Sequence, residues 1–143
     1  MPETTTPVPR LRQVVLDCTD PRLLAEFYRR LLGLEYRPGH ELTDPDGDDW
    51  LVLVVPGDGA NLAFQRVAEL PPATWPEGPV PQQLHLDLMV PDRTALDAHH
   101  ERALELGARL LRDEADDPEE ALRVYADPAG HPFCLFVGPD LAA

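Results

Sequence analysis

Two stretches of the chain alternate apolar and polar residues with the period of a β-strand. The stretch QLHLDLMVPD, residues 83–92, places three leucines on one side, whereas the other side carries His85, Asp87 and Met89. The earlier stretch RQVVLDCTD, residues 12–20, follows a similar pattern. We therefore predict two half-buried strands, each with an apolar face for packing and a more polar face that is free to carry chemistry.

Each predicted strand leads into an amphipathic helix. The apolar spacing predicts helices over residues 21–32 and 93–106, and an aspartate precedes each one as an N-cap. Gly33 and Gly107 follow the two helices, at the position where a left-handed backbone conformation is cheap only for glycine. The order of a strand followed by a helix thus occurs twice in the sequence.

The rest of each half predicts three further strands. These strands are expected at about residues 34–37, 50–55 and 61–67 in the first half, and 108–112, 122–126 and 132–137 in the second. Between the halves lies AELPPATWPEGPVP, residues 68–81, whose five prolines exclude regular structure. We interpret this segment as a linker within one domain.

Landmarks of the two halves recur at a nearly constant offset. The aspartates at 20 and 92 are 72 residues apart, the glycines at 33 and 107 are 74 apart, and those at 59 and 130 are 71 apart. Such spacing indicates a duplication of βαβββ type. We predict an α+β fold with a single domain over 1–143: module one at about 11–67, the linker at 68–81, and module two at about 82–138.

Composition limits the kind of partner. The net charge of −14 argues against nucleic acid and anionic membranes as partners. The longest apolar runs, such as residues 50–55, are too short to span a bilayer, and the first ten residues lack a signal-peptide core. Cys18 and Cys134 show no CxxC spacing, so no disulfide framework or zinc knuckle is indicated. We expect a cytoplasmic protein.

Four pieces of the sequence together resemble the vicinal oxygen chelate superfamily, which includes glyoxalase I, extradiol dioxygenases and bleomycin-resistance proteins. These pieces are VVLDCTDPRLLAEFYRRLLGLEY, HLDLMVPD, ELGARLL and YADPAGHPFCLFVG. The motifs HLDL and FCLF are similar to those of the glyoxalase-like subgroup. The resemblance implies that the two modules form a curled mixed sheet around a central cup. Leu84, Leu86 and Leu88 would then face the helix, and His85 and Asp87 the cup.

The resemblance also implies where a metal would bind. Metal-dependent members take ligands from the first and last strands of each module, and Gln13, His85 and Cys134 fall on three of these positions. The fourth position is either Ala63 or Gln65, because the register of that strand is open. Since this set contains no carboxylate, we expect neither an intact metal site nor another cofactor.

Two functions of different classes remain. The first is binding of a small organic molecule in the cup, without metal. The expected pocket residues are Gln13, Trp50, Gln65, His85, Asp87 and Cys134. The second is an enzyme, either a metal-dependent lyase or isomerase of glyoxalase I type or a dioxygenase, with His85 and Asp87 as catalytic residues. The resemblance further implies a homodimer.

Overall fold

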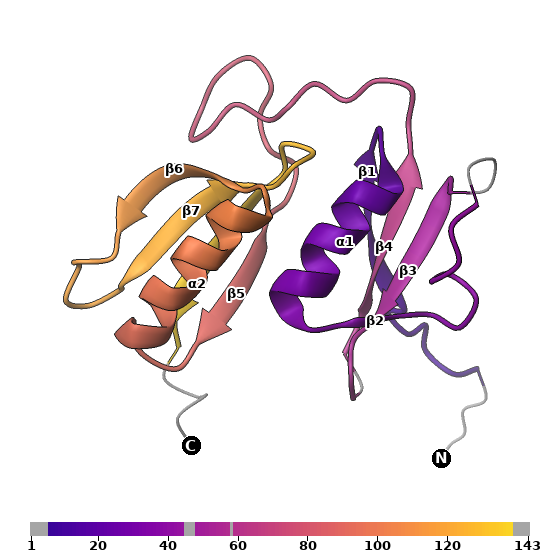
Figure 1. The fold of residues 1–143 in the computed structure, drawn as a ribbon, viewed down its shortest axis with the longest axis horizontal. Coiled ribbons are helices and arrows are strands. Elements are labelled where there is room, and N and C mark those ends of the chain that lie inside the picture. Colours follow the sequence, from indigo (N-terminus) through magenta and orange to yellow (C-terminus); the bar gives the residue numbers. More distant parts are fainter. Residues whose placement is uncertain (1–5, 45–47, 58, 139–143) are drawn as a thin grey trace.

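Two βαβββ modules lie side by side in the molecule (Figure 1). The computed structural model describes residues 6–44, 48–57 and 59–138, and the helices and strands of both modules lie within these ranges. The predicted α+β fold with its duplicated element order is confirmed. The ends of the expected domain, residues 1–5 and 139–143, lie outside the described residues.

The elements of the two modules correspond one to one. The first module contains β1 (Gln13–Cys18), α1 (Pro21–Leu32), β2 (Glu35–Tyr36), β3 (Trp50–Val54) and β4 (Asn61–Arg66). The second contains β5 (Leu86–Val90), α2 (Arg93–Leu106), β6 (Arg109–Glu114), β7 (Leu122–Ala126) and β8 (Pro132–Val137). The proline-rich linker crosses between the modules at the top of Figure 1, and its only strand-like feature is a bridge between Thr74 and Pro81.

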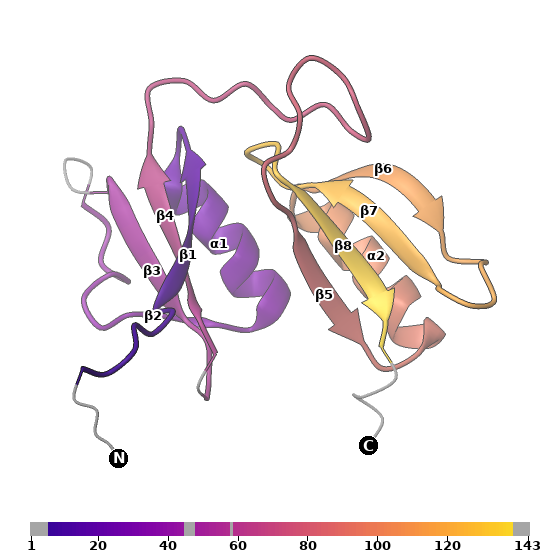
Figure 2. The same cartoon turned by 180° about the vertical axis from the view of Figure 1, so that it is seen from behind.

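Each module builds its own four-stranded mixed sheet. The strand orders are β1-β4-β3-β2 and β5-β8-β7-β6, with the first pair of each sheet parallel and the others antiparallel. The edge strands β1 and β5 face one another across the middle of the molecule, and α1 and α2 cover the same side of the two sheets (Figure 2). Within the described ranges no strand pairing joins the sheets, so the sheet around the cup is not closed.

Capping explains where the helices begin and end. The Asp20 carboxylate accepts a hydrogen bond from the Leu23 backbone nitrogen at 3.1 Å, and Asp92 does the same for the nitrogen of Ala95 at 2.8 Å. Gly33 ends α1 with a φ of 67°, in the left-handed region. Neither helix of the described chain is long and apolar enough to cross a bilayer.

Two sequence predictions differ from the structure. Strand β5 begins at Leu86 instead of Leu84, because its ladder with β8 begins where Leu86 pairs with Phe133. Leu84 therefore does not join the helix-facing row and is 49% exposed, whereas Leu86 and Leu88 pack against the core as expected. Strand β6 continues to Glu114, two residues beyond its predicted end, because it stays paired with β7.

The two modules share one aromatic core. Phe27 and Tyr28 of α1 contact Phe133 of β8 with ring centroids 5.8 Å and 6.1 Å apart. Tyr28 also stacks on Phe64 of β4, and Phe133 stacks on Tyr125 of β7 at 5.1 Å. Because these rings come from both modules and are almost fully buried, the halves are joined by packing as well as by the linker.

A buried carboxylate anchors this junction. Asp127, in the turn between β7 and β8, is 4% exposed and accepts a hydrogen bond from the Tyr28 hydroxyl at 2.6 Å. Its other oxygen accepts from the backbone nitrogens of Ala129 and His131. Burial raises the pKa of Asp127 above its ordinary value, and these hydrogen bonds and the nearby His131 only partly oppose that shift. The sequence predicted a turn here but not this contact.

Removing the Tyr28 hydroxyl is expected to destabilise the fold. In Tyr28→Phe the buried Asp127 oxygen loses its donor, which should lower the free energy of unfolding by about 1–3 kcal/mol. Tyr36→Phe is the matched control, because the Tyr36 hydroxyl donates to Glu26 in a partly exposed position and its loss should cost less. Urea denaturation of both variants measures the difference, and an equal loss would contradict this account.

The raised pKa of Asp127 predicts a pH dependence of stability. Because the folded carboxyl keeps its proton to higher pH than the unfolded one, its contribution to the free energy of unfolding falls as pH rises through the raised pKa. Compared with Asp127→Asn, the wild-type protein should thus lose stability from about pH 4 upward. Denaturation curves over this range test the sign. Asp116→Asn, at a carboxylate that is 97% exposed, should show no such relative loss.

Candidate ligand-binding site

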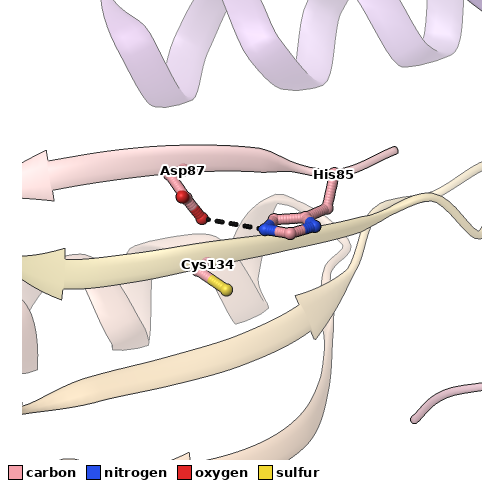
Figure 3. Close-up of side chains that lie close together, drawn as sticks. All are labelled: His85, Asp87 and Cys134. Atoms are coloured by element: carbon pink, nitrogen blue, oxygen red, sulfur yellow. Dashed lines mark ion pairs between the residues drawn. The ribbon is translucent and has the colours of Figure 1, made fainter. Parts of the chain in front are cut away.

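His85 and Asp87 lie together on the face of the second sheet that α2 does not cover. His85 directly precedes β5 and Asp87 is its second residue, so the alternation of the strand turns both side chains to the same face. The His85 Nε2 and Asp87 Oδ1 atoms are 3.3 Å apart (Figure 3). Both side chains keep access to solvent, with 44% and 58% of their surfaces exposed. We call this uncovered side of the second sheet its concave face.

Cys134 completes a cluster with this pair. It lies on β8 in register with Asp87, and the ligand-capable atoms of His85, Asp87 and Cys134 are within 4.8 Å of one another (Figure 3). Burial, followed by the neighbouring Asp87 carboxylate, raises the pKa of Cys134 to about 11. The thiol is therefore protonated at neutral pH, and it is not an activated nucleophile.

A cavity of about 290 Å³ opens over the concave face. Its floor consists of strand residues, and the linker supplies Trp75 at its edge. The lining residues are Trp75, Gln82, His85, Arg112, Glu114, Leu122, Val124, Pro132 and Cys134. Apolar walls with a few polar groups are typical of a small-molecule site.

The remaining predicted pocket residues lie on the first sheet. Trp50 and Gln65 are register partners on β3 and β4, and Gln13 begins β1. These positions alternate with the residues that pack against α1, so they face away from that helix. The structure thus brings together His85, Asp87 and Cys134, and of these His85 and Cys134 line the concave-face cavity. The other predicted pocket residues line neither this cavity nor the other cavities described for this part of the chain: Asp87, Gln13, Trp50 and Gln65.

Strand register resolves the position that the sequence left open. Ala63 pairs with Val15 on β1 as Cys134 pairs with Asp87 on β5, which makes Ala63 the module-one counterpart of Cys134. Ala63 is fully buried and offers no ligand atom. Gln65 lies two residues further along and is exposed.

These residues do not fit the metal site that the resemblance implies. That site takes donors from both modules, but here the position on β4 is Ala63, which offers no ligand atom, and none of the other three positions holds a carboxylate. The three potential donors that do cluster come from module two alone.

Three other histidines of the described chain have partners outside this cluster. His40 accepts a hydrogen bond from the Val52 nitrogen, and His100 contacts the Tyr125 hydroxyl at 2.8 Å. The His131 ring contacts the Asp17 carbonyl oxygen at 2.6 Å. His85 is the histidine that faces the cavity.

Sequence reasoning missed seven of the nine residues that line the cavity, among them Trp75, Gln82 and Arg112. A register shift on β6 between Leu110 and Arg112 breaks the alternation there, so the sequence pattern did not indicate that Arg112 would stand opposite Val124. No local pattern indicated that Trp75 of the linker would reach the second sheet. The Arg112 guanidinium lies 4.8 Å from the centre of the Trp75 ring and holds it there.

Solved structures share this fold at low sequence identity. A glyoxalase-related enzyme from Fulvimarina pelagi aligns with a TM-score of 0.67 and 20% identity, covering 92% of this chain and 90% of that one. A glyoxalase/bleomycin resistance protein/dioxygenase family enzyme from Burkholderia phytofirmans aligns with a TM-score of 0.66 and 16% identity, covering 90% of this chain and 98% of that one. Lactoylglutathione lyase from Agrobacterium tumefaciens aligns with a TM-score of 0.60 and 21% identity, covering 94% of this chain and 97% of that one.

The sequence comparisons agree with the fold. No curated protein matches the chain significantly. The family model of the glyoxalase-like domain matches residues 13–136, which include every helix and strand of the second module except the last residue of β8. The chain therefore belongs to the glyoxalase-like domain family, within the vicinal oxygen chelate superfamily.

Proposed function

We propose that this protein binds a small organic molecule on the concave face of its second module, without a metal. The observation that carries the proposal is the 290 Å³ cavity in which Trp75 of the linker faces strand residues that include His85 and Cys134. The volume is at the small end for ligand sites, and the mixture of an aromatic wall with few polar groups suits an organic ligand.

The polar groups of this cavity suit recognition better than nucleophilic chemistry. The Asp87 carboxylate beside His85 can fix the imidazole orientation, so that the ring offers a directed hydrogen bond to a ligand. Cys134 contributes a protonated thiol, which packs as a small and mostly apolar group. Gln13, Trp50 and Gln65, on the first sheet, would contribute only to a ligand that reaches across both modules.

A second candidate function is a metal-dependent lyase or isomerase of glyoxalase I type, or a dioxygenase, with His85 and Asp87 as catalytic residues. The three clustered side chains favour it, because an imidazole, a carboxylate and a thiol are all metal ligands. The similarity in fold to a structure titled lactoylglutathione lyase is consistent with this candidate. The missing donor at Ala63, and a cluster whose members all come from module two, favour binding without metal.

Metal analysis separates the two candidates. Protein purified without chelator should contain no stoichiometric divalent metal, and added Zn²⁺, Ni²⁺, Mn²⁺ or Fe²⁺ should leave its Tm unchanged, because Ala63 leaves the donor set incomplete. A metal at roughly one per chain that is lost in His85→Ala but kept in His99→Ala would establish the second candidate instead. His99, on α2, is the matched control.

Trp75 provides a direct readout of binding. In the Trp50→Phe variant Trp75 is the one remaining tryptophan of the chain, so its fluorescence reports on the cavity. In a screen of small organic molecules, binders should change this emission and raise the Tm. A larger side chain in the floor, as in Val124→Phe, should weaken them about tenfold or more, because it fills part of the cavity.

Val54→Phe is the control for the cavity-filling variant. Val54 lies on β3 of the first sheet and is partly exposed, so this substitution should leave affinity unchanged. A screen without any hit at Trp75, or hits that bind Val124→Phe as tightly as the Trp50→Phe parent, would refute binding at this site.

A further inference from the structure

A second, larger cavity adjoins the concave-face cavity. It has a volume of about 450 Å³ and lies at the junction of the modules, between β1, the linker and the β7–β8 turn. Gln82 and Pro132 line both cavities, so the two hollows share a wall. Most of the side chains around this junction cavity are apolar, and they include Val15, Leu70, Pro71, Ala73, Val80 and Leu84.

The side chains that line the two cavities differ in chemistry. The concave-face cavity contains Arg112 and Glu114, and the Arg112 guanidinium stacks on Trp75 but makes no hydrogen bond or ion pair with any described residue. Arg22 and Arg123, in contrast, are each paired with an aspartate. A stacked guanidinium keeps its N–H edge available, and that edge matches a carboxylate with two parallel hydrogen bonds.

Gln82 lies where the two cavities meet. Its side-chain oxygen is buried, yet no hydrogen-bond donor reaches it. A buried acceptor without a donor is costly, and a ligand hydroxyl or N–H group at this point would remove the cost. The wall that the two cavities share thus carries a polar position between the cavity that holds Arg112 and the apolar junction cavity.

We infer that the ligand is an organic acid with an apolar chain. Its carboxylate would bind the Arg112 edge, its chain would occupy the junction cavity beside Leu84 and Val80, and a donor group on the chain would face Gln82. This inference rests on the function proposed above and specifies the class of ligand for that site. The apolar hollow stabilises the chain by burial, and the arginine selects the charge.

A series of matched amphiphiles tests this inference. Hexanoate, octanoate and decanoate are titrated into the Trp50→Phe protein, below their micelle concentrations, with Trp75 fluorescence and calorimetry as readouts. Affinity should rise about fourfold per added methylene, because each one is buried in the junction cavity. Decanol should bind more weakly than decanoate, and decyltrimethylammonium should not bind at Trp75. The absence of chain-length dependence, or equal binding of the cation, overturns the inference.

Two pairs of variants locate the ends of the ligand. Arg112→Gln should weaken decanoate about tenfold or more and should weaken decanol much less, whereas Arg109→Gln, on the same strand but outside both cavities, should change neither. Leu84→Gln should reduce the gain per methylene, and Leu104→Gln, at an exposed leucine of α2, should not. Equal effects within either pair overturn the corresponding assignment.

A third comparison tests Gln82. At least one hydroxylated decanoate should bind more tightly than decanoate, and Gln82→Leu should abolish that gain because the acceptor is removed. If no hydroxylated acid binds more tightly than decanoate, the inference that a ligand donor faces Gln82 is wrong. If decanoate fails while other screened compounds bind at Trp75, the ligand class is overturned and the binding function stands. If no compound of either kind binds there, the proposed function fails as well.

Discussion

The hydrogen bond from Tyr28 to the buried carboxyl of Asp127 fixes how the two modules meet. Tyr28 belongs to the helix of one module and Asp127 to the last turn of the other. Around this contact the rings of Phe27, Phe64 and Phe133 form one continuous core. Because the junction runs through α1 and the β7–β8 turn, the edge strands β1 and β5 do not pair with each other among the described residues, and each sheet keeps its own uncovered face.

That geometry decides where a site can form. A cluster with donors from both modules would need the two uncovered faces to converge, but the structure gathers His85, Asp87 and Cys134 on one sheet alone. The linker supplies a wall of the site in place of the first sheet, because it is held between the modules and brings Trp75 to the second sheet. Gly130 contributes to this arrangement: a Cβ at this position would lie 2.6 Å from Pro72, so glycine permits the linker to rest on the turn.

Local rules predicted most of the fold, but the expected pocket residues included only two of the nine that line the concave-face cavity, His85 and Cys134. Alternation placed His85 and Asp87 on one face, capping residues located both helices, and β7 and β8 matched their predicted bounds. Other features depend on contacts between distant segments, which no local pattern contains. The burial of Asp127, the approach of Trp75 to Arg112 and the choice between Ala63 and Gln65 are of this kind. Leu84 was misplaced because the β8 ladder, not alternation, determines where β5 begins.

The central claim is that a ligand binds on the concave face of the second module and not between the two sheets. A crystal structure of the protein with a compound that changes Trp75 fluorescence tests it most directly. The account predicts density for the ligand between Trp75, His85 and Cys134, with no metal at the cluster. Density for the ligand on the first sheet, against Trp50 and Gln65, or coordinated by a metal on His85, would contradict it.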